Sequence, residues 1–500
     1  MQVERYIAVA DLGSSTLALS VARVEGDDVQ IIYYSQTPSD GVRYSLVFNP
    51  VRAAKPLKEA IQKAEKELNI KILQLVIGLP RYNVRQEVAS ARMERTDASS
   101  CITKEEIDTL KSIAIDSYPM DENAKEEIYG AVAQSFSADE DLVCASENDV
   151  IGVTSESIEG NFKIFIGKSS AVDNLDIMLN KAGVAPARKL FLPTATGRAV
   201  LTEAEKENGV ALVEIGAAVT SLTIYKGGLL RHYSSIRFGG GSITSDIKFE
   251  CGFTERLAEN IKLAFGACMP DKLQSLSEKI IQINDDENGS YEQLPVKYLS
   301  EIITCRAREI INAILFQIQE SGYADSLRNG LVLTGGGAEL VNFANMFKEM
   351  SGYTVRLGYP RSQLFSSGGC PGVNETSAAA AMGMILEAKR DPRLNCVEEA
   401  PSERKASEEQ QDAGQQNDSQ GQAAGEETAH QNGTLFGDGA DELIVPDKKK
   451  KKKDQVKITW IRKMGKKISN SLEGAFDSTV GELFDKMDED NREDYGRTDN

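Results

Sequence analysis

The sequence is poor in histidine, in paired cysteines and in long apolar runs. Its two histidines, His232 and His430, argue against a histidine-based catalytic triad and against a metal site with several imidazole ligands. The seven cysteines are scattered without a Cys-x-x-Cys pair, which is typical of buried thiols in a reducing compartment. No run of 18 apolar residues occurs, and residues 6–10 are too short for a signal peptide. We therefore expect neither export nor a transmembrane helix, so a membrane role would be peripheral.

Positive charge is also scarce overall, but it is concentrated near one end of the chain. Lys and Arg number 57 against 76 Asp and Glu, a net charge of −19, and such a chain repels nucleic acid unless its basic residues gather in one place. Residues 448–467 hold eleven basic residues and one acidic residue, including six consecutive lysines. The hydrophobic content of 41% predicts that most of the chain folds around a sizeable core.

Two segments of the chain resemble each other. Each predicts three strands, with a carboxylate and a tight turn after the first: Asp11-Leu-Gly-Ser-Ser in one and Glu214-Ile-Gly-Ala-Ala in the other. The predicted strands are residues 6–11, 17–24 and 30–35, then 210–214, 221–225 and 229–235. A duplicated α/β fold is therefore expected.

Further elements follow in each half. In the first, Pro56 is expected to start an amphipathic helix, and residues 73–78 return as a strand. In the second, helices are expected at residues 257–265 and around 302–318, before a strand at 330–334. A helix is expected to begin near Ala338, after three glycines.

A small α+β subdomain is expected to interrupt the first half. Residues 81–167 contain three strand patterns of their own (83–91, 127–133 and 162–167) and a helix for which Thr103 and Glu106 form a capping box.

Three turns carry the chemistry that suits a nucleotide. Asp11 could hold a Mg²⁺-bound water, Gly13 lets the backbone approach a ligand, and the N–H groups of Ser14 and Ser15 could face phosphate oxygens. Alone this motif is more often an ordinary turn, but a second copy at Glu214 would clamp a phosphate chain from the other side. The strand ending at Thr334 supplies a third loop, Gly335, Gly336 and Gly337.

These three motifs, with Leu333-Thr-Gly-Gly-Gly as the third, resemble the two phosphate motifs and the adenosine motif of the actin and sugar-kinase superfamily. Within it the chain resembles the FtsA family of bacterial actin homologues. The resemblance covers about residues 5–390 and the far C-terminus. It is carried also by Thr202-Glu-Ala-Glu-Lys-Glu-Asn-Gly-Val-Ala-Leu-Val, Gly240-Gly-Ser-Ile-Thr-Ser-Asp-Ile and Arg356-Leu-Gly-Tyr-Pro.

The resemblance implies an actin-like (RNase H-type) duplicated fold that binds ATP with Mg²⁺. It assigns Asp11, Gly13, Ser14 and Ser15, then Glu214, Gly216, Ala217 and Ala218, and finally Gly335, Gly336 and Gly337 to the nucleotide, with Asp11 also toward the metal. Glu259 and Lys262 match the pair that holds ribose and base, although their spacing alone favours a solvated surface pair.

Two departures from the family pattern bear on catalysis. The second loop has Ala217 and Ala218 where glycines are usual, and Leu192 stands where superfamily ATPases carry the glutamate that polarises the attacking water. Because a water-orienting group contributes ~10²–10⁴-fold, we expect ATP binding with weak or absent hydrolysis and assign no catalytic residue.

The C-terminal part has a different composition. Residues 393–447 are expected to form a disordered acidic linker, since residues 397–447 carry 13 acidic and two basic residues and one aromatic. Residues 448–475 predict a basic amphipathic helix that lies on a membrane, and residues 476–500 an acidic tail. A solvated basic run or a nucleic-acid patch would lack the apolar stripe of this helix. The helix is defined by its apolar residues Trp460, Ile461, Met464, Ile468 and Leu472 and its basic residues Lys463, Lys466 and Lys467.

The resemblance further implies a cell division protein that polymerises and tethers FtsZ to the cytoplasmic face of the membrane at the septum. Its expected partners are FtsZ, further copies of itself, an anionic membrane surface and, through residues 81–168, later division proteins, but not nucleic acid. A small-molecule kinase or a chaperone-like ATPase of the same superfamily is the alternative. In the family's nomenclature we expect subdomain 1A at 1–80 and 169–202, 1C at 81–168, 2A from 203–246, 2B at 247–326, and a return to 2A and 1A at 327–392.

Overall fold

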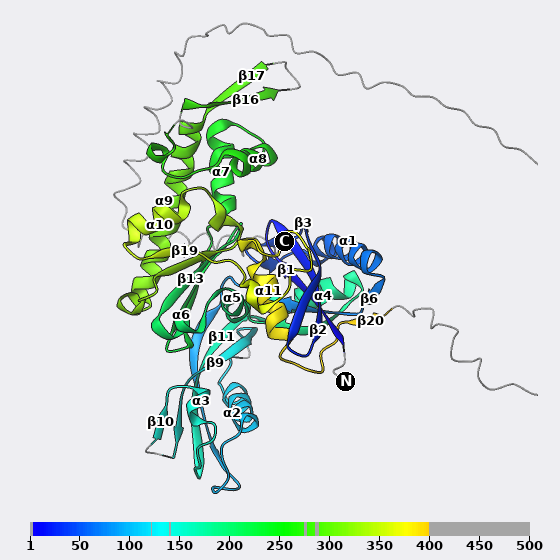
Figure 1. The fold of residues 1–500 in the computed structure, drawn as a ribbon, viewed down its shortest axis with the longest axis vertical. Coiled ribbons are helices and arrows are strands. Elements are labelled where there is room, and N and C mark those ends of the chain that lie inside the picture. The colour runs from blue at the N-terminus through cyan, green and yellow to red at the C-terminus, as the bar shows by residue number, and fades with distance from the viewer. Residues whose placement is uncertain (1–3, 122, 140–141, 275–277, 286–289, 400–500) are drawn as a thin grey trace, which may run out of the picture. The chain divides into compact units, whose positions relative to one another are not determined.

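The computed structural model describes residues 4–121, 123–139, 142–274, 278–285 and 290–399 (Figure 1). Every helix within these ranges is too short or too polar to span a lipid bilayer. The expected linker beyond Glu399, the membrane helix and the acidic tail lie outside the described residues.

The first half is built on a five-stranded sheet. Three strands form an antiparallel meander, and two later strands lie parallel to the first, in the order β12-β7-β1-β2-β3. The predicted strands are confirmed, each with slightly different ends. They are β1 (Arg5–Leu12), β2 (Thr16–Glu25), β3 (Asp28–Pro38) and β7 (Gln74–Gly78). The fifth strand, β12 (Ala185–Leu190), was not predicted.

The second half repeats this topology. Its sheet has the order β15-β14-β13-β18-β19, again an antiparallel meander followed by two strands parallel to the first. The duplicated actin-like α/β fold expected from the sequence is confirmed. The strands are β13 (Val210–Ile215), β14 (Thr220–Lys226), β15 (Leu229–Ile236), β18 (Leu331–Thr334) and β19 (Val355–Leu357).

Helices cover the first sheet. α1 (Pro50–Leu68) packs on α4 (Ser169–Ala182), while α5 (Leu192–Val200) packs on α11 (Ala379–Ala388), which also contacts β1. The expected helix start at Pro56 is wrong. The helix begins six residues earlier, because the Asn49 side chain accepts the Arg52 backbone N–H and Pro50 occupies the first turn, where a missing N–H costs nothing.

The second half carries its own helices and a hairpin. They surround a core that includes Ile247, Ile303 and Ile310, with no exposed surface. The helices are α6 (Glu203–Asn208), α7 (Gly240–Cys251), α8 (Glu255–Phe265), α9 (Val296–Glu320) and α10 (Phe343–Ser351). The hairpin is β16 (Ile280–Asp285) with β17 (Ser290–Pro295), and short 3-10 turns are η1 (Pro270–Lys272), η3 (Ala324–Ser326), η5 (Ser362–Leu364) and η6 (Thr376–Ala378).

An inserted sheet of four antiparallel strands has the order β10-β9-β11-β8. The predicted capping box is present, because Thr103 and Glu106 each accept the other's backbone N–H at the start of α2. The strands are β8 (Arg85–Glu94), β9 (Glu126–Ala138), β10 (Leu142–Cys144) and β11 (Ser157–Lys168), and the helices are α2 (Lys104–Asp116) and α3 (Glu147–Val150).

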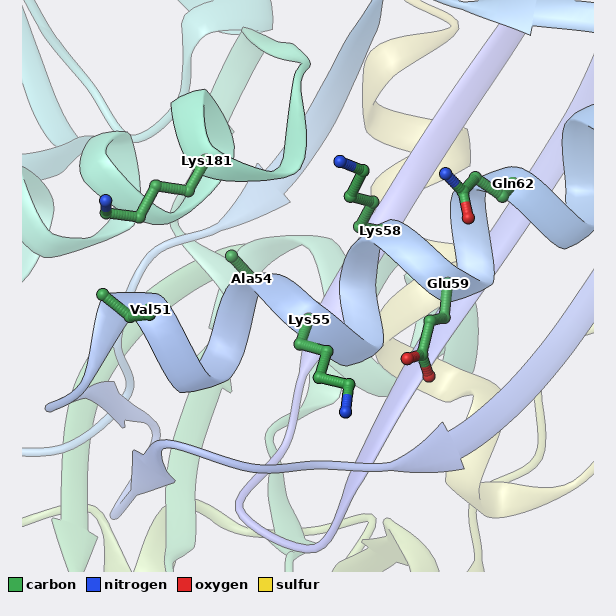
Figure 2. A pocket seen from close by; sticks show the side chains of 7 residues that line it. All are labelled: Val51, Ala54, Lys55, Lys58, Glu59, Gln62 and Lys181. Atoms are coloured by element: carbon green, nitrogen blue, oxygen red, sulfur yellow. The ribbon is translucent and has the colours of Figure 1, made fainter.

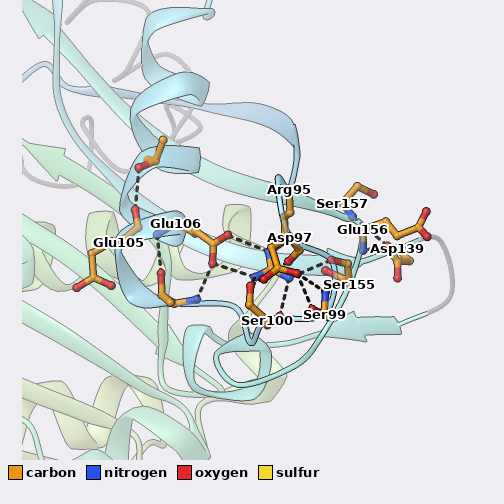
Figure 3. A network of polar contacts seen from close by, with 12 residues as sticks. Arg95, Asp97, Ser99, Ser100, Glu105, Glu106, Asp139, Ser155, Glu156 and Ser157 are labelled. Atoms are coloured by element: carbon orange, nitrogen blue, oxygen red, sulfur yellow. Dashed lines mark hydrogen bonds and ion pairs between the residues drawn. The ribbon is translucent and has the colours of Figure 1, made fainter.

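A polar network holds one end of this inserted subdomain together (Figure 3). The Arg95 side chain, 1% exposed, donates to Glu106 Oε1 at 2.9 Å and to the carbonyl oxygens of Ser100 and Ser155 at 2.9 and 3.0 Å. Asp139 Oδ1 accepts the backbone N–H of Glu156 at 2.9 Å. The network joins the start of α2 to the loop ahead of β11.

Short strands complete the fold and correct one expectation. The pair β4 (Val42–Arg43) and β5 (Leu46–Val47) follows β3, and β20 (Val397–Glu399) pairs with β6 (Ile70–Ile72). Cys396 is fully buried. The disordered linker therefore does not begin at residue 393, because residues 393–399 belong to the folded body.

Candidate nucleotide site

The first predicted loop is a tight turn between β1 and β2. Gly13 donates its backbone N–H to Thr16 O at 3.0 Å, and an added Cβ would lie only 2.6 Å from that oxygen. Ser14 Oγ accepts the backbone N–H of Ser45 at 3.2 Å, and Ser15 is exposed. The sequence favours this turn because glycine alone tolerates the close approach.

The second loop repeats the first. Gly216 donates to Val219 O at 2.9 Å, just as Gly13 donates to Thr16, and half-buried Ala217 and Ala218 follow. The carbonyl oxygens of Gly216 and Ala217 accept the backbone N–H groups of Gly240 and Gly241 at 2.9 and 2.7 Å. The N-terminus of α7 is thereby held against this loop.

The third loop lies against the second. An added Cβ at Gly335, where φ is +83°, would be 2.5 Å from Ile215 O, and one at Gly337 would be 2.5 Å from Ile215 Cγ2. The expected helix near Ala338 is wrong: Gly336–Glu339 forms a 3-10 turn (η4), and α10 begins at Phe343. The residues between these two segments turn the chain before the helix starts, so no α-helix N-terminus follows directly on the glycines.

Glu259 and Lys262 lie at this junction. Lys262 Nζ donates to Glu259 Oε2 at 2.7 Å, to Gly240 O at 2.9 Å and to Thr244 Oγ1 at 2.9 Å, and its side chain is 11% exposed. An added Cβ on Gly240 would be 3.5 Å from Lys262 Nζ and 4.0 Å from Gly337 Cα. Lys262 is therefore largely buried beside the second and third loops, whereas the Glu259 side chain is 36% exposed.

The side chain of Arg81 joins the first and second loops. Arg81 donates through Nη2 to Asp11 Oδ1 at 2.7 Å and forms an ion pair through Nη1 with Glu214 Oε1 at 2.8 Å. The exposed fractions of the three side chains lie between 9% and 13%. The two loop carboxylates, 203 positions apart in sequence, thus share one guanidinium.

Burial and charge perturb this triad in opposite directions. Burial raises the pKa of Glu214, Arg81 opposes the rise, and Asp11 adds to it. Burial lowers the pKa of Arg81, but the carboxylates of Asp11 and Glu214 outweigh it, and the net pKa is raised. The guanidinium stays charged and offsets part of the repulsion between the two carboxylates.

The structure therefore brings together every predicted nucleotide residue group. Arg81 forms ion pairs with both Asp11 and Glu214. Gly240 donates its backbone N–H to Gly216 O and lies beside Gly337 and Lys262. Arg81 is a residue of this cluster that the sequence motifs do not include. Its sequence signal is its place three residues after the end of the strand β7.

Leu192 stands at the first position of α5. Its side chain is 2% exposed and packs on Gly78, where an added Cβ would be 2.4 Å from Leu192 Cδ1. An apolar, tightly packed side chain therefore occupies the position for which the resemblance predicts a carboxylate in superfamily ATPases.

A surface depression of about 370 Å³ lies elsewhere, along α1 (Figure 2). It contains none of the residues predicted to bind nucleotide. Its lining residues are Val51, Ala54, Lys55, Lys58, Glu59, Gln62 and Lys181.

Comparison with known proteins agrees with the resemblance. Residues 211–383 match the family model described as "Cell division protein FtsA". The chain is 30% identical over 366 residues to the cell division protein FtsA of Neisseria meningitidis, covering 72% of this chain and 85% of that one. It is 28% identical over 401 residues to FtsA of Borreliella burgdorferi, covering 78% and 93%.

Among solved structures, the fold is similar to a chain of the PilM-PilN type IV pilus biogenesis complex. The TM-score is 0.54 at 16% identity, and the match covers 77% of this chain and 99% of the other. At that identity the likeness concerns the fold alone. The sequence match to whole relatives decides the family: this chain is a member of the FtsA family of cell division proteins.

Proposed function

We propose that this chain binds ATP with Mg²⁺, polymerises, and tethers FtsZ to the cytoplasmic face of the membrane at the division septum. The observation that carries the nucleotide part is the convergence of three glycine-containing turns from both halves of the fold, two of them with a carboxylate. Such turns let a ligand approach the backbone closely, as phosphates require.

The nucleotide would lie between the two halves. Residues 11–15 and 214–218 would hold its phosphates, the pair Glu259 and Lys262 its ribose and base, and residues 335–337 its adenosine. Lys262 supports this assignment because its ammonium group is already fixed beside the second and third loops.

The residues at the first loop fit a magnesium ion. Asp11 Oδ1 is paired with Arg81, and the half-buried carboxylate has a second oxygen that could accept a metal-bound water. One carboxylate together with substrate phosphates is a common way in which proteins hold Mg²⁺. The ion would neutralise phosphate charge when bound.

Hydrolysis is expected to be slow or absent. Leu192 cannot orient a water, and its packing on Gly78 leaves a longer polar side chain no room without rearrangement. ATP would then act chiefly as a ligand that favours assembly. A turnover comparable to that of an efficient ATPase would contradict this part of the proposal.

Membrane attachment is assigned to residues 448–475, which lie outside the described residues. Each basic residue near an anionic surface contributes about 1 kcal/mol, and each large apolar side chain that is buried fully about 1.5–3 kcal/mol. One such helix would bind reversibly, whereas a row of subunits would present many helices at high effective concentration. Assembly would therefore set the residence time at the membrane.

The division into subdomains is proposed with the boundaries given above, except that residues 393–399 are added to the folded body. The inserted subdomain, residues 81–168, is proposed as the surface for later division proteins because its sheet has two edge strands, β8 and β10.

Co-sedimentation with anionic liposomes and FtsZ, with and without ATP, tests the proposal. Deleting residues 448–475 should abolish liposome binding while ATP affinity is preserved, and deleting residues 476–500 is the matched control. Unchanged liposome binding after the first deletion would refute the membrane anchor. Phosphoryl transfer to a small molecule would favour the kinase alternative instead.

A further inference from the structure

Arg81 occupies a position that its structural role does not fully explain. It lies in the segment between β7 and β8, with its backbone N–H directed to Ser45 Oγ at 3.4 Å and its carbonyl oxygen accepting the Tyr233 hydroxyl. Its guanidinium is held by Asp11 and Glu214, one from each phosphate loop. The backbone and the side chain are thus both fixed, and the side chain is aimed at the point where the loops meet.

One nitrogen of this guanidinium, Nε, donates no hydrogen bond to the described residues. Arg81 Nε is buried and has no hydrogen-bond acceptor within the described parts of the chain. Buried donors in folded proteins nearly always find a partner, since leaving one unpaired costs free energy. An N–H group that lacks an acceptor at the edge of a ligand site indicates that the ligand supplies one.

The charges around Arg81 indicate what kind of ligand this is. With both carboxyl groups ionised, Asp11, Glu214 and Arg81 together carry one net negative charge, and the two carboxylates would repel a phosphate chain unless a cation stood between them. A guanidinium is the side chain best suited to this task, because its planar donors match phosphate oxygens.

We propose that Arg81 is a phosphate-binding residue of the nucleotide site, whose Nε–H donates to a phosphate oxygen of the bound nucleotide. This inference rests on the proposed nucleotide binding. It adds a ligand contact to a residue that the sequence motifs do not include, and it gives the orphan donor its acceptor.

The competing explanation is that Arg81 only neutralises the loop carboxylates. The two explanations differ in what a charge-restoring second substitution does. Arg81→Gln leaves two unneutralised negative charges, whereas Arg81→Gln combined with Glu214→Gln returns the cluster to the net charge of the natural protein without restoring a guanidinium.

The experiment measures the affinity of the full chain for ATP and for adenosine, which has no phosphate. If Arg81 contacts a phosphate, Arg81→Gln should weaken ATP binding by roughly ten- to hundredfold, the effect of one charge-assisted hydrogen bond. Adenosine affinity should change less than about twofold. Arg81→Gln/Glu214→Gln should remain as weak for ATP as the single variant and weaker than Glu214→Gln, which measures the effect of losing the loop carboxylate alone. Arg92→Gln, an exposed arginine on β8, is the control and should bind ATP normally.

Three results would overturn the inference while leaving nucleotide binding intact. These are an unchanged ATP affinity in Arg81→Gln, an equal loss for ATP and adenosine, and a return to natural ATP affinity in the double variant. The double variant has the natural net charge. If Arg81→Gln does not fold, the affinities of the double variant for ATP and adenosine are compared directly with those of the natural protein. A natural protein that binds neither ligand would instead refute the proposed nucleotide site itself.

Discussion

Replacing Gly335 by alanine tests whether the third loop is held against the second as the structure shows. Gly335 has φ +83° and ψ 160°, a region that residues with a Cβ rarely adopt and that costs about 1–3 kcal/mol. The new Cβ would also lie 2.5 Å from Ile215 O and 3.0 Å from Ile215 N, both backbone atoms of β13. These atoms cannot move far, because β13 pairs with β18 through Glu214 and Thr334.

Relief of such an overlap adds about 1–3 kcal/mol, so the variant should lose roughly 2–6 kcal/mol of unfolding free energy. Denaturant unfolding of the full chain, followed by circular dichroism, measures the loss. ATP affinity should fall as well, since the loop must shift.

Gly336→Ala is the matched control one residue away. Its new Cβ would meet Ser377 Cβ at 3.9 Å, an ordinary contact, and its φ is outside the region that favours glycine. Stability should therefore stay within about 0.5 kcal/mol. Because this Cβ projects from the third loop with ample room, ATP affinity should still drop if the nucleotide lies against that backbone. Natural stability in Gly335→Ala would refute the loop geometry, and natural ATP affinity in Gly336→Ala would refute the assignment of this loop to the nucleotide.

Three further outcomes are expected. Arg95→Met should destabilise the inserted subdomain by about 1–3 kcal/mol, because it leaves Glu106 and the carbonyl oxygens of Ser100 and Ser155 without their donor, and hydrogen exchange on α2 measures this. Arg95 holds the pKa of Glu106 below its ordinary value of 4.5, so the stability from this pair is present above pH 4.5 and is lost as pH falls through the folded pKa. The difference in unfolding free energy between the natural protein and Arg95→Met should accordingly shrink in acid. A constant difference from pH 7 to pH 3 would contradict this role of the ion pair. Lys262→Met should weaken ATP binding by roughly tenfold, while exposed Lys248→Met should not, as titration calorimetry can establish.

Much of the fold follows from local sequence. The alternation of apolar residues predicts the meander in each half, and the repeated carboxylate and glycine at Asp11 and Glu214 predict equivalent turns. The capping box at Thr103 and Glu106 was likewise predictable, because its two hydrogen bonds join residues only three apart. These features depend on side-chain period and backbone angles over a few residues, which the sequence states directly.

Other features depended on contacts between distant segments. β20 is three residues long with no periodic pattern, and it is a strand only because the edge of β6 is available to it. The start of α1 was misplaced because two prolines six residues apart give the same local signal, and the Asn49 cap decides between them. The prediction of a helix near Ala338 was also wrong, since helix propensity does not specify where the chain must turn to pack against neighbouring segments.

The candidate site likewise combines features set by local sequence with features set by contacts between distant segments. The sequence by itself determined which turns could accept phosphates, because a turn's glycines and its carboxylate are local properties. Only the tertiary structure decided that Arg81 joins Asp11 to Glu214, at separations of 70 and 133 residues. An ion pair requires its atoms within about 4 Å of each other, and only the folded chain brings residues so far apart in sequence to that distance.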